Sequence, residues 1–197
     1  MHGLINRAVQ CFLRDTYGAD LWRAVAERAG VGADGFEAML LYDDAVTDVL
    51  LDAAAARLDR PVEAILEDLG TYLVSHPNLE PLRRLLRFGG VGFVDFLHSL
   101  DDLPGRGRLA VPDLDLPQLE LHEEEAGRFA LLCRADHPGF AHVMSGVLRA
   151  MADDYGALVL LEHETLDSGV ARIGIHLLDQ SFAAGRSFEL AAMPVRA

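Results

Sequence analysis

Apolar residues recur at three- and four-residue steps through most of the first 103 residues, which predicts a series of amphipathic helices. Two short helices are expected within 1–29, and a connection rich in Gly and Asp follows over 30–43. A long helix opens at 42–44, another begins after Pro61, and a third spans about 79–86. The last runs over 92–103 and should end at Pro104, with a loop after it, because proline inside a helix removes a backbone donor.

After Pro117 the period of the apolar positions changes from helical to alternating, which predicts strands. Residues 119–122 and 129–133 are expected to form a hairpin with an acidic turn at 123–127. A second hairpin is expected from 157–163 and 170–178, with its turn at 167–169, and a helix over 139–155 separates the two. This β-β-α-β-β order predicts an antiparallel sheet crossed by a helix, so the fold class is α+β.

The length of 197 residues favours a single domain, 1–197, with a sizeable core. We expect two lobes, a helical lobe over about 1–88 and an α/β lobe over about 89–197. Hydrophobic residues make up 51% of the chain but are dispersed among charges, so no stretch approaches the roughly 20 apolar residues of a membrane helix. The first 19 residues lack the apolar region of a secretion signal, so a cytoplasmic protein is expected.

The net charge is −14, from 31 acidic and 17 basic residues, and it would repel a phosphate backbone. Nucleic acid is therefore not an expected partner. The two cysteines, Cys11 and Cys133, are too few and too far apart for a zinc site or a disulfide framework, and both are expected to be buried thiols.

Motifs of catalysis are missing from the sequence. It contains no Gly-rich phosphate loop after a strand, no G-x-S-x-G elbow and no H-E-x-x-H, and no acid and base pair can be named. An enzyme is not expected.

Three stretches carry motifs that match one family. The first has the order M-x-G-x-x-N-x-A and Y-G-x-x-x-W, met by Met1, Gly3, Asn6, Ala8, Tyr17, Gly18 and Trp22. The second, within 42–72, includes Tyr42, Asp44, Thr47, Ile65, Leu66, Glu67, Gly70 and Tyr72. The third is met by Phe96, Leu97, Leu100, Asp101, Leu103, Pro112 and Pro117. Together they resemble the haem nitric oxide/oxygen-binding (H-NOX) family over nearly the whole chain.

The resemblance implies a helical lobe joined to an α/β lobe, with haem held between them. In the family the residue after the last Leu of the third stretch is the histidine that binds iron, but here it is Pro104, which has no lone pair to give. The family's Y-x-S-x-R clamp for the haem propionates falls on Cys133, Ala135 and His137, or in another phase on Leu131, Cys133 and Ala135. His137 can replace the arginine with only one donor and is largely neutral above about pH 7.

Other histidines could bind iron instead. The family match places His142 near a distal pocket position, so it is the best candidate, and His98 is second, although helical geometry turns it about 120° from the old ligand direction. Otherwise no metal is expected. The pocket positions that the family match gives are Ile5, Pro104, Pro117, Leu119, Cys133, Ala135, His137 and His142.

Three functions are consistent with these residues. The first is a stand-alone, non-enzymatic signalling module whose haem ligation is lost and whose pocket is filled or binds another ligand. The resemblance implies a signalling partner such as a histidine kinase or a diguanylate cyclase. The second is a haem gas sensor for nitric oxide or oxygen with unusual ligation, and the third is a ligand-free module that binds a partner.

Overall fold

The computed structural model describes residues 1–32, 34–166 and 170–188 of the chain. Its helices are α1 Gly3–Tyr17, α2 Ala19–Arg28, α3 Asp44–Leu58, α4 Val62–Ser75, α5 Glu80–Arg87, α6 Phe93–His98, α7 Leu103–Ala110 and α8 Phe140–Tyr155, with 3-10 turns η1 Pro77–Leu79 and η2 Leu100–Asp102. The strands are β1 Gln118–Glu125, β2 Arg128–Arg134, β3 Leu158–Thr165 and β4 Ala171–Asp179. The predicted α+β class and β-β-α-β-β order are confirmed, while the expected turn at 167–169 lies outside the described residues.

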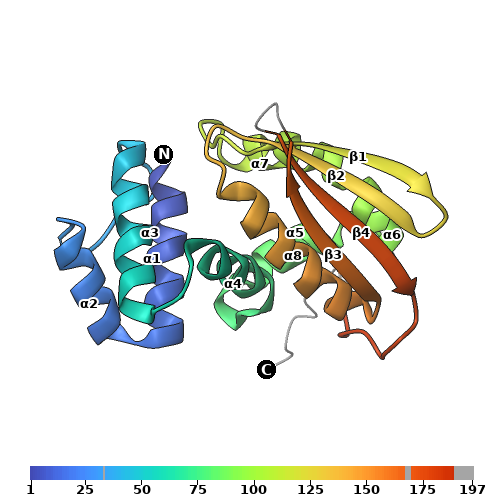
Figure 1. The fold of residues 1–197 in the computed structure, drawn as a ribbon, viewed down its shortest axis with the longest axis horizontal. Coiled ribbons are helices and arrows are strands. Elements are labelled where there is room, and N and C mark those ends of the chain that lie inside the picture. The colour runs from blue at the N-terminus through green and yellow to red at the C-terminus, as the bar shows by residue number, and fades with distance from the viewer. Residues whose placement is uncertain (33, 167–169, 189–197) are drawn as a thin grey trace, which may run out of the picture.

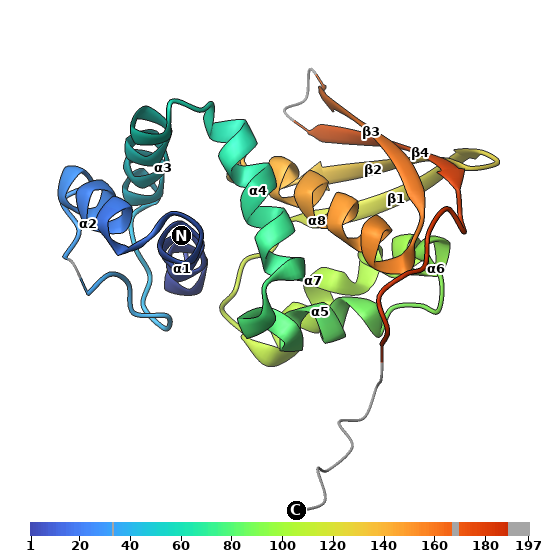
Figure 2. The same ribbon diagram turned by 90° about the horizontal axis from the view of Figure 1, so that it is seen from below.

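The helices α1, α2 and α3 gather at one end of the molecule, and the sheet lies at the other, with α4 and α8 between them (Figure 1). The view from below shows α8 against the sheet and α5, α6 and α7 farther from it (Figure 2). Two hydrophobic clusters correspond to these ends. One joins residues from Val9 to Tyr72, and the other joins residues from Val74 to Ile175.

The N-terminal helices are joined by buried polar contacts as well as by apolar packing. Asn6 on α1 is fully buried and accepts a hydrogen bond from the Thr47 hydroxyl of α3 at 2.7 Å. The Asp43 side chain caps α3 by accepting from the backbone N–H of Ala45 at 3.0 Å, which satisfies one donor of the first turn. The N-terminal amine also donates to the backbone oxygen of Tyr42 at 2.8 Å. The start of the chain is thereby fixed against α3.

Glycines allow α4 and α8 to pack with their backbones almost in contact. A Cβ atom added to Gly146 would lie 1.9 Å from the Glu67 backbone oxygen, and one added to Gly70 would lie 2.1 Å from that of Val143. Any larger side chain would push the two helices apart. Nearby, both terminal nitrogens of Arg149 donate to Glu67 at 3.1 Å.

The four strands pair in the antiparallel order β1-β2-β4-β3, so β1 and β3 form the edges. Leu121 pairs with Leu131 and Phe129 with Ile175, which directs one apolar face of the sheet toward α8. The acidic turn predicted at 123–127 is wrong in its extent. β1 continues through Glu125 with an irregular register after Glu123, and the chain reverses at Ala126 and Gly127, where Gly127 supplies a positive φ of 76°. The glutamates of this run are exposed on an edge strand.

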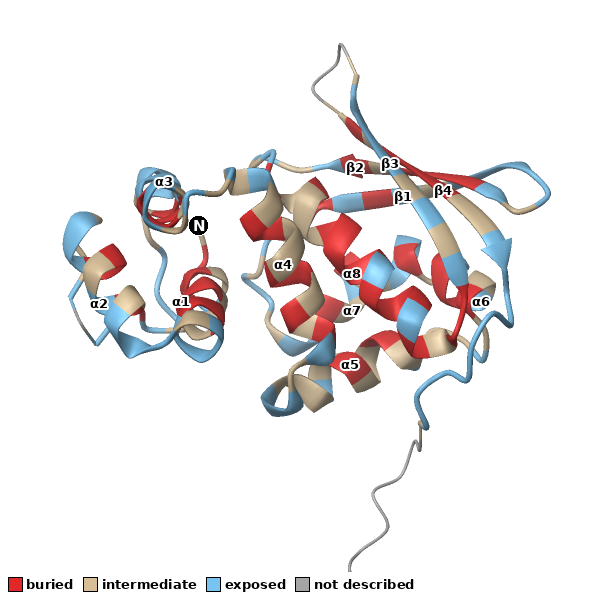
Figure 3. Ribbon diagram, turned by 60° about the horizontal axis from the view of Figure 1, so that its bottom comes forward, coloured by how far each residue is buried: buried red, intermediate tan, exposed pale blue. Residues whose placement is uncertain are grey.

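Burial follows the same division (Figure 3). The buried side of α8 faces the sheet and α4, and the core between them extends to α6. Cys133 is buried there, but Cys11 on α1 is only half-buried, so the expectation of two buried thiols is correct for one. Among the described residues, none of the helices has the length and apolar character needed to cross a bilayer.

The prediction that one helix runs over 92–103 and stops at Pro104 is wrong. α6 ends at His98, η2 follows, and α7 begins at Leu103 with Pro104 in its first turn. Proline is compatible with that position, because the first N–H groups of a helix have no intrahelical partner. Pro104 therefore starts a helix where the sequence indicated a loop.

Candidate site between the helices and the sheet

The seat that the family match assigns to the iron ligand is a buried proline at the start of α7. Pro104 is shielded from solvent, and α7 is held to the preceding helices by Arg106. Arg106 donates from Nη2 to the Ser99 backbone oxygen at 2.8 Å and from Nη1 to that of Leu85 at 3.4 Å. The Asp101 carboxylate accepts from the Leu121 backbone N–H at 2.8 Å, which joins η2 to the edge of the sheet. The seat is thus fixed from both sides.

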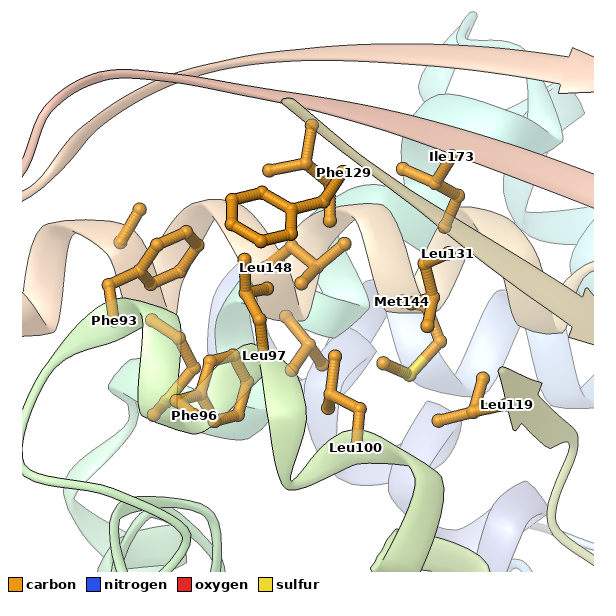
Figure 4. Close-up of a cluster of buried hydrophobic side chains, with 14 of the residues drawn as sticks. Phe93, Phe96, Leu97, Leu100, Leu119, Phe129, Leu131, Met144, Leu148 and Ile173 are labelled. Carbon is orange, nitrogen blue, oxygen red and sulfur yellow. The ribbon is translucent and has the colours of Figure 1, made fainter. Parts of the chain in front are cut away.

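Apolar side chains occupy the interior between this seat, the sheet and α8. Figure 4 shows Leu100 of η2, Leu119 of β1 and Met144 of α8 directed into one cluster. Leu100 is completely buried, and Leu119 and Met144 are 7% and 6% exposed. Leu97 and Leu131, both completely buried, extend the same cluster. Side chains of α6, η2, β1, β2 and α8 therefore fill this region.

The first predicted clamp residue, Cys133, lies within that cluster. It is 3% exposed, and burial raises the pKa of its thiol to about 11, so the thiol stays neutral at physiological pH. Leu119 is its partner on β1. Both residues therefore pack within the apolar core, and their assignment to the pocket stays a prediction of the family match.

The other two predicted clamp residues lie beyond the strand. β2 ends at Arg134, so Ala135 and His137 are in the turn before α8 and do not share a strand face with Cys133. Strand pairing stops at Arg134, opposite Gln118, so the alternation of the family's clamp does not continue to His137 in this chain.

His137 makes a bond between the two ends of the molecule. Its Nδ1 accepts from the Gly139 backbone N–H at 3.1 Å, so the proton of a neutral ring is on Nε2. Nε2 lies 2.9 Å from the Asp48 carboxylate on α3. His137 thereby connects the turn before α8 to the N-terminal helices.

A cavity of about 480 Å³ opens beside this bond. Four predicted pocket residues line it, namely Ile5, Pro117, Ala135 and His137. Its wall also includes Arg108 of α7 and Arg134 of β2, and Arg134 donates to Glu120 at 2.8 Å. Its lining includes the charged residues Asp44, Asp113 and Asp136, whereas the leucine cluster is apolar.

His142 lines a different cavity, of about 570 Å³, between α3, α4 and the turn before α8. Asp48, Asp52 and Glu63 also line this second cavity. The ring of His142 is 4.2 Å from that of His163 on β3, measured between centroids, and its buried Nδ1 has no hydrogen-bond partner among the described residues. Burial and the neighbouring His142 lower the pKa of His163. This histidine pair has no sequence signal, because its members lie on the separate elements α8 and β3.

His98 is exposed at the end of α6, and its ring lies 6.1 Å from that of Phe129. In the part of the chain that the structure describes, no group of three or more His, Cys, Asp or Glu side chains is arranged to hold a metal ion. The residues at the matched positions do not fit a haem held in the family's usual way. The seat offers no lone pair, and the clamp positions are a core thiol, a methyl group and a histidine bound to Asp48.

The model of the haem-NO-binding family matches residues 2–163. The chain belongs to the H-NOX family. Its helices and sheet superpose on the crystal structure of an H-NOX protein from S. oneidensis in the Fe(II)NO ligation state, with a TM-score of 0.76, 16% identity, and coverage of 91% of this chain and 100% of that one. The Fe(II) unliganded H-NOX protein from K. algicida gives a TM-score of 0.76 at 16% identity, covering 91% and 97%.

Curated relatives of this H-NOX chain are soluble guanylate cyclases. Gcy-31 of Caenorhabditis elegans is 25% identical over 186 residues, which cover 91% of this chain and 26% of that protein. Soluble guanylate cyclase 89Da of Drosophila melanogaster is 22% identical over 158 residues, covering 80% and 24%. The H-NOX chain thus spans about a quarter of the length of these relatives. An H-NOX domain is a haem-based sensor domain of signalling proteins rather than a catalytic domain.

Proposed function

We propose that this chain is a regulatory H-NOX domain that has lost the family's haem ligation and works without haem. The observation that carries the proposal is the packed interior beside Pro104. Leu97, Leu100 and Leu131 are each completely buried in one cluster, so a porphyrin placed between Pro104 and the sheet would have to displace them. Because interiors are packed at crystal-like density, such a displacement is costly.

The test is an absorbance scan of the purified full chain after expression with haem supplied in excess. We expect no stoichiometric Soret band. A band at one haem per chain that shifts when nitric oxide is added would refute the haem-free proposal.

Pro104→His separates a missing ligand from a filled interior. If only the ligand were missing, this change would restore haem uptake. We expect no uptake, because Leu100 and Leu119 still fill the space. Stoichiometric haem binding by the variant would show that the interior opens readily. The missing histidine ligand would then be the sole reason that the native chain binds no haem.

A gas sensor with unusual ligation is the second candidate function, and the observation that favours it is the buried, unpartnered Nδ1 of His142. It predicts haem uptake by the native chain that His142→Ala abolishes, while His98→Ala, at an exposed position, leaves it unchanged. Equal uptake by the native chain and His142→Ala would eliminate His142 as the ligand.

The cavity of about 480 Å³ is the place where we propose that this domain keeps a ligand site. Ile5, Pro117, Ala135 and His137 would contact the ligand, and Arg108 would offer it a positive charge. The signal would reach an effector enzyme, for which we propose a histidine kinase, a diguanylate cyclase or a guanylate cyclase like those of the curated relatives. Copurification of the full chain with one of these enzymes, weakened by Arg108→Ala only when a ligand is present, would support this assignment.

A further inference from the structure

The buried carboxylate of Asp154, near the end of α8, forms ion pairs with several arginine side chains. Asp154 is 1% exposed, and Arg83 of α5 donates to it from Nε at 2.8 Å and from Nη2 at 3.2 Å. Arg87 lies 3.3 Å from the same carboxylate, and Glu80 holds the other side of Arg83 at 3.1 Å. A two-pronged bond between arginine and a carboxylate is strong and fixes the geometry of both groups. α5 and α8 are therefore joined firmly at this point, which we call the α5–α8 junction.

The chain after β4 returns across this junction. The backbone N–H of Ala183 donates to the Gly156 oxygen at 3.0 Å, and that of Arg186 donates to the Asp154 oxygen at 2.9 Å. The approach is so close that a Cβ atom added to Gly185 would lie 2.8 Å from the Asp154 backbone oxygen. One added to Gly156 would lie 2.1 Å from the Ala183 oxygen. Residues 183–188 thus lie on the junction as a fitted peptide.

Residues 186–188 make further contacts with Asp154, Arg83 and Arg87. Nε of Arg186 is 3.7 Å from the Asp154 carboxylate, and the backbone oxygen of Ser187 accepts from Arg83 at 3.2 Å. The Arg87 guanidinium lies close to two aromatic rings, 3.9 Å from the centroid of Tyr155 and 5.0 Å from that of Phe188. Such cation–π contacts attract, so the final described residue is held as well.

The junction also touches α6. The Tyr155 hydroxyl donates to the backbone oxygen of Gly90, just before α6, at 2.9 Å. The Tyr155 ring lies 6.3 Å from Phe93 and 6.0 Å from Phe96, both on α6. A shift of α6 would therefore move Tyr155 and, through Arg87, the surface on which Phe188 rests.

We propose that residues 183–188 are a reversible peptide latch, docked on the α5–α8 junction, whose docking is coupled to the position of α6. Undocking is feasible because Asp154 keeps Arg83 and Arg87 as partners when the latch leaves, so no buried charge is left unpaired. Arg186 is the outermost partner, with 53% of its side chain exposed. In this proposal the docked and the undocked latch are the two states that coupling requires.

Hydrogen exchange of the full chain, followed by mass spectrometry, tests the docking. Gly185→Ala places a methyl group against the Asp154 backbone, while Gly105→Ala on α7 meets nothing within 4 Å and is the matched control. We expect the amides of Ala183 and Arg186 to exchange about tenfold faster in Gly185→Ala, as for local opening, with no change in the control. Exchange at the native rate in Gly185→Ala would overturn the proposal.

Tyr155→Phe tests the coupling, because it removes only the hydroxyl that binds Gly90. We expect about threefold faster exchange at the latch amides in this variant as well as near Gly90. Acceleration near Gly90 alone would show that α6 and the latch are independent and would overturn the proposal. If Gly185→Ala also accelerates exchange in the interior of α8, its effect is not local to the latch. The same exchange measurement on Phe188→Ala then decides. Faster exchange confined to the latch supports docking, and unchanged or uniformly faster exchange refutes it.

Discussion

Leu100→Ala measures how tightly the interior beside Pro104 is filled. The change removes three carbon atoms from a side chain that is completely buried, which costs about 2.4 kcal/mol of transfer free energy at about 0.8 kcal/mol per group. Leu97 and Met144 are fixed by their own helices and cannot fully close the space, so a cavity adds to the cost. We expect the free energy of unfolding to fall by about 3 to 4 kcal/mol and Tm by about 6–16 °C.

Urea unfolding followed by circular dichroism and by the fluorescence of Trp22, the single tryptophan, gives the comparison. Trp22 lies in the other hydrophobic cluster, so agreement of the two signals shows that the domain unfolds as a unit. Leu109→Ala on α7, where the side chain is 87% exposed, is the control and should change stability by less than about 0.5 kcal/mol. A loss below about 1 kcal/mol for Leu100→Ala would mean that the interior is loosely packed, and the case against haem would fail.

Three further changes test other parts of the structure. Gly146→Ala should cost about 1 to 3 kcal/mol in the same unfolding assay, because the new Cβ lies 1.9 Å from a backbone oxygen of α4, and an unchanged midpoint would contradict this packing. Iodoacetamide at pH 8 should leave Cys133 unmodified in the folded protein, since the pKa of its buried thiol is about 11, whereas rapid modification would show that it is accessible. NMR titration should give His163 a pKa below its ordinary value near 6.5, rising in His142→Ala. Folded His163 then binds fewer protons than unfolded His163, so its contribution to stability should fall as the pH falls below about 6.5. A measured pKa at or above 6.5 would refute this expectation.

The helices and strands could be predicted from the sequence because each has a clear apolar period. Leu119 and Leu121 alternate as a strand requires, and Phe140, Val143 and Met144 follow the spacing of a helix. The helix boundary at Pro104 could not be predicted, since proline is equally compatible with the end of one helix and the first turn of the next.

The site was harder to predict because it depends on contacts between distant elements. Pro138 directly follows His137 and is consistent with a strand that ends before it, since proline cannot donate to a sheet. The bond between His137 and Asp48 and the ring contact of His142 with His163 have no local sequence signal. Family motifs could identify the positions, while the filling of the interior required the packed structure.

The acidic edges of the sheet have a consequence for how molecules meet. β1 exposes Glu120 and the run from Glu123 to Glu125, and β3 at the opposite edge exposes Glu162 and Glu164. Two copies that approached strand to strand would bring these carboxylates together, so at neutral pH repulsion opposes continuous sheets across molecules. Near the isoelectric point of about 4.8 the repulsion between these carboxylates weakens. We therefore expect the protein to aggregate through its edge strands in acid.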